Sequence, residues 1–132
     1  MHNEIGQNQT TFYFIITNFR SDIVIDIVCE AIDFLGGKAH QGMADATMEI
    51  LEEIKDTLRT ALKKYPGFKL FITGHSLGGG VGTLMTMAIR AGKIQDYVPY
   101  DVPLMCKVFA PPPVFFSEVS SLFKNTSNRC IA

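Results

Sequence analysis

Apolar runs alternate along the chain with stretches in which apolar residues recur every three or four positions. Three apolar runs predict strands, at residues 11–17, 68–73 and 104–110, and a fourth run begins at 129–132. The first run is β-branched and aromatic throughout, which is typical of a strand buried on both faces of a parallel sheet. Glycines and prolines bound the runs, so each predicts a separate strand.

Three stretches with helical periodicity predict helices. Residues 41–65 carry the clearest pattern, and Pro66-Gly67 ends it. Residues 79–91 predict a second helix that stops at Gly92, and residues 22–35 predict one that stops at Gly36-Gly37. The apolar stripe of the long helix comprises Met43, Ile50, Ile54, Leu58, Ala61 and Tyr65.

The order of these elements predicts an α/β protein with a mostly parallel sheet, because helices alternate with strands along the chain. Residues 96–103 contain two prolines and two tyrosines and predict a loop, and three prolines close the strand at 104–110. We expect a polar segment at residues 1–10 and one domain at residues 11–132.

Composition narrows the function classes. The chain has 132 residues with 47% hydrophobic and 19% charged positions, so it can bury a core. Its net charge is -1 and its basic residues are scattered along the sequence, which argues against a nucleic-acid partner. The polar start lacks the pattern of a secretory signal, and three cysteines are an odd number. We therefore expect reduced thiols and an intracellular protein, either cytoplasmic or peripheral to a membrane.

One local pattern carries chemistry, the sequence Gly74-His75-Ser76-Leu77-Gly78. Gly-x-Ser-x-Gly between a strand and a helix is the pattern of a nucleophile elbow, a sharp turn that exposes the serine. The pattern predicts Ser76 as a catalytic nucleophile and the backbone N–H of Leu77 as an oxyanion donor. The glycines fit neither a P-loop nor a dinucleotide-binding pattern, and we expect no cofactor and no metal.

Several stretches, in order, resemble the class 3 lipases, most closely the branch of sn-1-specific diacylglycerol lipases. Residues 73–79 resemble the elbow of that family, and His40-Gln41-Gly42-Met43 is similar to the sequence before its long helix. Residues 65–70 resemble its link from helix to strand, and residues 109–114 resemble the turn after the next strand. The resemblance implies an α/β-hydrolase fold and cleavage of a di- or triacylglycerol ester through an acyl-enzyme. The implied partners are a glycerolipid substrate and a membrane surface touched peripherally.

The chain departs from the family pattern in its histidines. In α/β-hydrolases the serine precedes the acid and the acid precedes the histidine, yet His2, His40 and His75 all precede Ser76. We therefore expect a fold that is incomplete at its carboxyl end, with the triad acid and histidine outside this sequence. The alternative is a catalytically inactive lipase-like fragment that binds lipid or a partner.

The other polar candidates have weaker claims to catalysis. Asp96 and Asp101 precede the third strand, which is the wrong place for the family's acid. The loop that supplies a second oxyanion donor in the family is about five residues shorter here, and Ser21 could substitute for that donor. Asp22 and Asp26 fit helix-surface or capping roles. We expect structural roles for His40 and His75, and core packing for the group Met85, Met87, Phe115 and Phe116.

Overall fold

A computed structural model describes residues 11–16, 30–116 and 130–131. Within these residues the chain forms two sheets and two helices. The elements in chain order are β1 (Thr11–Ile16), β2 (Ala31–Phe34), β3 (Gly37–His40), α1 (Gln41–Lys64), β4 (Lys69–His75), α2 (Leu77–Arg90), β5 (Leu104–Phe109), β6 (Phe115–Phe116) and β7 (Cys130–Ile131). The helices predicted at 41–65 and 79–91 are confirmed, as are the strands predicted at 11–17, 68–73, 104–110 and 129–132, each within a few residues.

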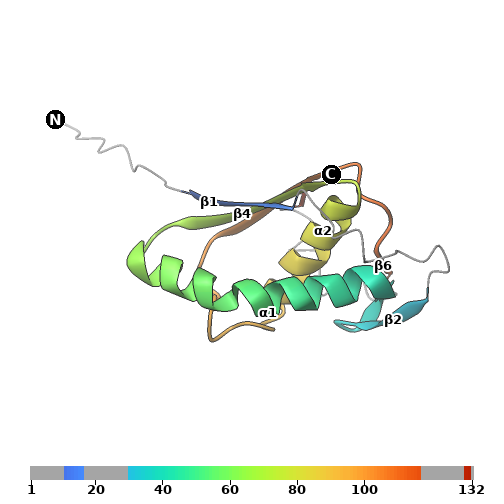
Figure 1. The fold of residues 1–132 in the computed structure, drawn as a ribbon, viewed down its shortest axis with the longest axis horizontal. Helices are drawn as coiled ribbons and strands as arrows, with labels where there is room; N and C mark the ends of the chain where they lie inside the picture. Colours follow the sequence, from blue (N-terminus) through green and yellow to red (C-terminus); the bar gives the residue numbers. More distant parts are fainter. Residues whose placement is uncertain (1–10, 17–29, 117–129, 132) are drawn as a thin grey trace.

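The main sheet is parallel and has the strand order β1-β4-β5-β7. Each crossover therefore moves in the same direction across the sheet. Because parallel crossovers are right-handed, α1 and α2, which belong to the first two crossovers, fall on the same face of the sheet. Figure 1 shows this arrangement, with α1 and α2 both on one side of β1 and β4. α2 packs directly on β4 and β5, and α1 packs on α2.

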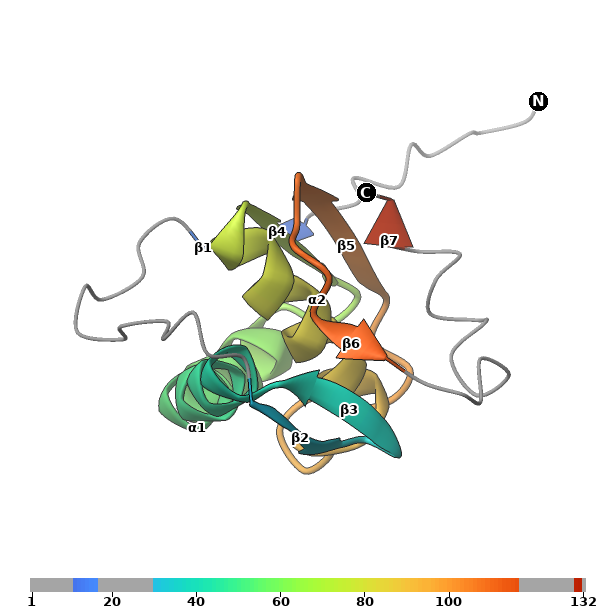
Figure 2. The same ribbon diagram turned by 90° about the vertical axis from the view of Figure 1, so that its right-hand side faces the viewer.

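The second sheet is a small antiparallel one that the periodicity did not predict. β2 and β3 form a hairpin, and β6 pairs with the other edge of β3 (Figure 2). The helix predicted at 22–35 is therefore wrong for residues 31–34, and residues 22–29 lie outside the described part of the chain. Leu35 and Gly36 have φ of 50° and 79°, as a two-residue hairpin turn requires, and this turn reverses the chain where a helix would continue.

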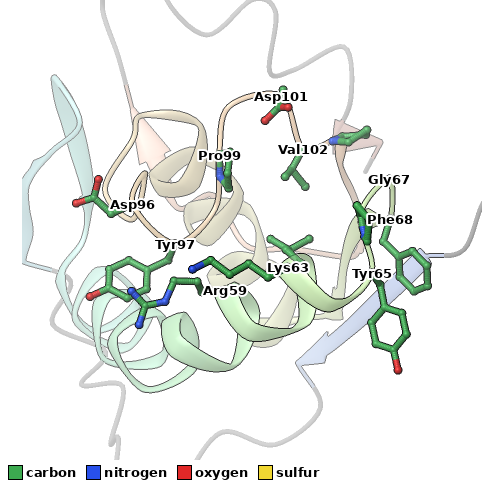
Figure 3. A pocket seen from close by; sticks show the side chains of 13 residues that line it. Arg59, Lys63, Tyr65, Gly67, Phe68, Asp96, Tyr97, Pro99, Asp101 and Val102 are labelled. Atoms are coloured by element: carbon green, nitrogen blue, oxygen red, sulfur yellow. The ribbon is translucent and has the colours of Figure 1, made fainter.

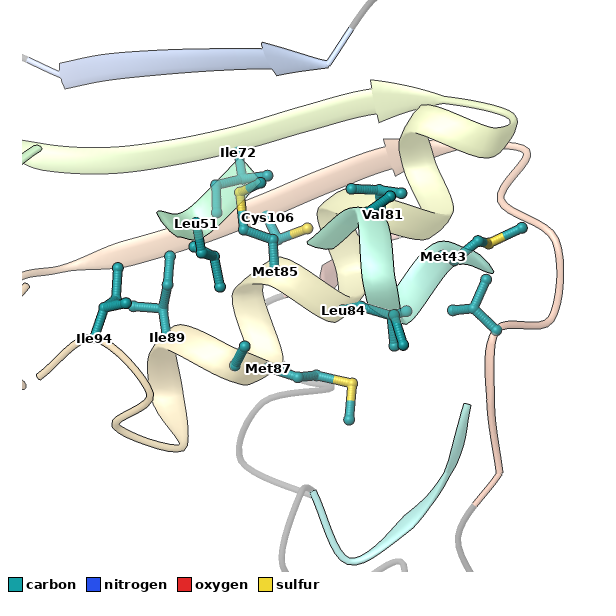
Figure 4. Close-up of a cluster of buried hydrophobic side chains, with 14 of the residues drawn as sticks. Met43, Leu51, Ile72, Val81, Leu84, Met85, Met87, Ile89, Ile94 and Cys106 are labelled. Atoms are coloured by element: carbon teal, nitrogen blue, oxygen red, sulfur yellow. The ribbon is translucent and has the colours of Figure 1, made fainter. Parts of the chain in front are cut away.

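The core lies between the helices and one face of the parallel sheet. Figure 4 shows Ile72 of β4 and Cys106 of β5 facing Met85 of α2, with Leu51 of α1 beside them. All four side chains are buried, and the thiol of Cys106 also lies 3.8 Å from the Gly82 carbonyl of α2. The prediction of core packing is confirmed for Met85 and Met87, and Phe115 is partly buried against the core. It is wrong for Phe116, which is exposed because β6 is an edge strand and successive side chains of a strand point to opposite faces.

The opposite face of the parallel sheet is open in the described part of the chain. Its exposed apolar side chains are Tyr13 and Ile15 of β1 and Met105 and Phe109 of β5. In register, Tyr13, Phe71 and Met105 form a row across three strands. The prediction that the first strand is buried on both faces is therefore wrong for Tyr13 and Ile15, because both described helices lie on the other face.

Candidate active site

Ser76 occupies the turn between β4 and α2, at the carboxyl end of the parallel sheet. β4 lies between β1 and β5, so the turn has a strand on each side. The serine is exposed and has φ 53° and ψ -123°, a conformation that L-residues rarely adopt. Strand, strained serine and helix follow one another as the predicted elbow requires.

The absence of a side chain at Gly74 makes room for this turn. A Cβ atom on Gly74 would lie 2.4 Å from the carbonyl oxygen of Gly78 and 2.5 Å from its carbonyl carbon. Because those are backbone atoms, no side-chain movement could relieve the contact. Glycine at position 74 is thus explained by the close approach of the last residues of β4 to the first turn of α2.

Backbone hydrogen bonds fix Ser76 on both sides. Its N–H donates to the carbonyl of Phe109, the last residue of β5, at 2.9 Å, and its carbonyl accepts from the N–H of Gly80 at 3.1 Å. The serine is thereby attached to the neighbouring strand and to its own helix. Both hydrogen bonds are made by backbone atoms, so the turn is held in place without the side chain of Ser76.

The amino terminus of α2 supplies positive electrostatic potential beside the serine. Leu77 is the first residue of the helix, and the first N–H groups of a helix have no partner within it. The helix dipole adds partial positive charge at the same end. The Leu77 N–H is therefore placed next to Ser76, where an oxyanion donor would be needed.

A segment after β5 packs against this first turn of α2. A Cβ on Gly80 would lie 2.8 Å from Sδ of Met43 in α1 and 2.8 Å from Cγ1 of Val114. Pro112 lies nearby, at 3.5 Å from the same point. Glycine at position 80 thus lets α1 and the segment 111–114 press closely on the helix that carries Ser76. The sequence predicted the end of a strand and a turn at these prolines, but not their packing against α2.

The described residues provide no partner for the serine hydroxyl. Within residues 11–16, 30–116 and 130–131, Ser76 Oγ makes no hydrogen bond. His75 is exposed at the end of β4. His40 immediately precedes α1, and its buried Nδ1 has no hydrogen-bond partner in this part of the chain. No general base is therefore assembled on Ser76 by these residues.

The remaining candidates lie elsewhere. Asp96 and Asp101 belong to the loop before β5, at the amino end of the sheet and thus at the opposite end from Ser76. His2, Ser21, Asp22, Asp26 and Cys29 lie outside the described residues. Among the residues that the structure describes, no group of three or more His, Cys, Asp or Glu side chains could hold a metal ion. The described helices include none with the length and apolar character needed to cross a bilayer.

A cavity of about 300 Å³ lies at that amino end of the sheet, between the last turns of α1 and the loop before β5 (Figure 3). Tyr65, Pro66, Gly67 and Phe68, which link α1 to β4, also line it. Ser76 is not among the lining residues. One strand of seven residues, roughly 20 Å long at the usual rise, separates the cavity from the serine.

Comparison with known proteins identifies a family that matches most of the chain. The family described as "Lipase (class 3)" matches residues 3–131. The lipase of Rhizomucor miehei is 29% identical over 87 residues, which are 62% of this chain and 24% of that protein. The secreted mono- and diacylglycerol lipase 1 of Fusarium solani is 33% identical over 87 residues, which are 66% of this chain and 23% of that protein.

A solved structure supports the same fold. The native Rhizomucor miehei lipase propeptide complex superposes with a TM-score of 0.58 at 25% identity, covering 71% of this chain and 30% of that one. The chain spans about a quarter of the length of the curated relatives that it matches. The shared region includes a parallel sheet with helices, which is the α/β-hydrolase fold that the sequence predicted.

Proposed function

The chain belongs to the class 3 lipase family, and on that premise we propose that it is a serine hydrolase that cleaves a di- or triacylglycerol ester through an acyl-enzyme. Family membership supports the reaction class, and the names of the relatives, which include a mono- and diacylglycerol lipase, support the substrate class. The observation that carries the proposal is the exposed Ser76 at φ 53°, held between β4 and the amino terminus of α2.

In the proposed reaction, Ser76 Oγ attacks the carbonyl carbon of the ester, and its proton passes to a general base. The carbonyl oxygen becomes an oxyanion, which the Leu77 N–H and the dipole of α2 would stabilise. Collapse of this intermediate breaks the ester bond, the base returns the proton to the leaving alcohol, and the acyl group stays on Ser76. Water then attacks the acyl-enzyme by the same route and releases the fatty acid.

The base in this scheme is a histidine oriented by an acid, and we place both outside these 132 residues. Every histidine of the sequence precedes Ser76, whereas the α/β-hydrolase order puts the histidine last. A serine without a base is a weak nucleophile. The alternative, a lipase-like module that binds lipid or a partner without catalysis, is favoured by the same observation.

Labelling with a fluorophosphonate probe, with diacylglycerol hydrolysis as a second readout, distinguishes the serine hydrolase from the binding module. The expected result is covalent labelling of the full-length gene product and fatty-acid release, both abolished in Ser76→Ala. A matched control is Thr60→Ala, which removes an exposed hydroxyl from α1. Equal labelling of the wild type and Ser76→Ala would refute the nucleophile. Absence of both labelling and hydrolysis, together with retained binding to diacylglycerol-containing vesicles, would instead establish the binding module.

A further inference from the structure

The cavity at the amino end of the sheet has a basic side formed by α1. Arg59 and Lys63 are four residues apart and line it from the last turns of that helix (Figure 3). The guanidinium of Arg59 is held at 2.8 Å from the Asp56 carboxylate and lies 4.8 Å from the ring centre of Tyr97. Lys63 has no ion-pair or hydrogen-bond partner among residues 11–16, 30–116 and 130–131. Its ammonium is therefore available to a ligand.

The other side of the cavity is acidic. Asp96 and Asp101 belong to the loop that follows α2, and both contribute to the lining. In Figure 3 the carboxylate of Asp96 points outward at the edge of the cavity, whereas Asp101 lies on the loop beside Val102. Neither carboxylate forms an ion pair within the described part of the chain, so the two sides do not neutralise each other across the cavity. The remaining lining includes apolar side chains, and Leu62, Tyr97 and Val102 among them pack against the core, which gives the cavity a firm wall.

We propose that this cavity binds a small zwitterion, with its anionic group toward Arg59 and Lys63 and its ammonium group toward Asp101. Charges on two sides of one cavity favour a ligand whose charges are separated by a short apolar spacer. A volume of about 300 Å³ is at the lower end for small-molecule sites and fits a molecule of that size. Phosphoethanolamine, a lipid headgroup, and 5-aminopentanoate, a free amino acid with separated charges, share this chemistry.

The proposal stands apart from the activity assigned to Ser76, because the two sites lie at opposite ends of β4. Titration calorimetry with phosphoethanolamine and 5-aminopentanoate, in separate experiments, tests it on the full chain. Inorganic phosphate and ethanolamine, each alone, are the single-charge probes. We expect saturable binding of at least one zwitterion and weaker binding of both single-charge probes. The ligand that binds more tightly identifies the source, lipid headgroup or amino acid.

Charge substitutions locate the site. Lys63→Glu and Asp101→Lys should each weaken binding of the zwitterion by about tenfold, as expected when one hydrogen bond to a charged group is lost. The double variant should recover part of that loss, because the ligand can bind in the reverse orientation. Lys64→Glu is the matched control, since Lys64 is exposed, lies over the Tyr65 ring at 5.3 Å and does not line the cavity. Ser76→Ala should bind like the wild type.

Three results would overturn the proposal. One is the absence of saturable binding by either zwitterion to a chain shown to be folded by circular dichroism. The second is binding of inorganic phosphate as tight as that of phosphoethanolamine, which would mean a simple anion site. The third is an equal loss of affinity in Lys64→Glu and Lys63→Glu, which would mean non-specific attraction to α1. Failure of the Ser76 labelling experiment would leave all of these outcomes unchanged.

Discussion

The backbone N–H of Ser76 donates a hydrogen bond of 2.9 Å to the carbonyl of Phe109, the last residue of β5. The parallel register pairs His75 with Phe109, so this bond continues the contact between β4 and β5 one residue beyond their last register pair. The neighbouring strand therefore holds the turn in its strained conformation. The side chain of Ser76 is left exposed for chemistry.

Replacing Ser76 by glycine should stabilise the protein while removing its nucleophile. Glycine adopts a positive φ without the penalty that serine incurs, and the gain in unfolding free energy should be up to about 1 kcal/mol. Urea unfolding measures the gain, and the fluorophosphonate probe measures the loss. Ala110→Gly is the control, because Ala110 also has a positive φ of 46°. This control should stabilise the chain without affecting labelling. If Ser76→Gly were less stable than the wild type, the inference that the backbone of Ser76 is strained would be wrong.

Gly74→Ala should destabilise the chain by about 1–3 kcal/mol, in the range for overpacking. The new methyl group would lie 2.4 Å from the Gly78 carbonyl oxygen, so β4 and α2 would have to separate. Denaturant unfolding checks the loss of stability. Gly42→Ala is the matched control, since its methyl group would lie 3.5 Å from His40 Cε1, an ordinary contact. If both variants unfolded at the same denaturant concentration, the close approach at Gly74 would be refuted.

Gly80→Ala should also destabilise the chain, and a second substitution should relieve part of the effect, because Sδ of Met43 would also lie 2.8 Å from the new methyl group. That methyl group would lie 2.8 Å from Val114 Cγ1, which the Val114→Ala substitution removes. The contact costs about 1–3 kcal/mol, more than the roughly 1 kcal/mol that alanine gains over glycine in a helix. A double-mutant cycle measures the coupling between the two sites. Strictly additive effects would show that position 80 and Val114 do not touch.

Met105→Lys should reduce aggregation with little change in unfolding free energy. Met105 is 44% exposed on the open face of the parallel sheet, in a row with Tyr13 and Phe71. Contiguous exposed apolar side chains promote association. Light scattering and binding of a hydrophobic dye measure the effect. Leu104→Lys is the contrasting variant, because Leu104 is 1% exposed and its replacement should unfold the chain. Equal stability of the two variants would contradict the alternation of buried and exposed side chains along β5.

The sequence by itself determined the elements whose pattern is local. The long helix α1 follows from its periodic apolar residues and its stop at Pro66-Gly67, and β4 and β5 follow from short apolar runs. The elbow could be placed on Ser76 because Gly-x-Ser-x-Gly stands between a strand and a helix. The same local signals missed the β2–β3 hairpin, since Ala31, Ile32 and Leu35 have the spacing of a helix stripe and only pairing with residues 37–40 makes residues 31–34 a strand.

Only the tertiary structure decided which face of each strand is covered and which side chains meet. Tyr13 and Ile15 read as buried, yet they are exposed because both described helices lie on the other face of the sheet. The hydrogen bond from Ser76 to Phe109 and the cavity between α1 and the loop before β5 join residues more than thirty positions apart. A local pattern carries no information about such contacts, because they depend on the direction of each crossover and on the register between strands.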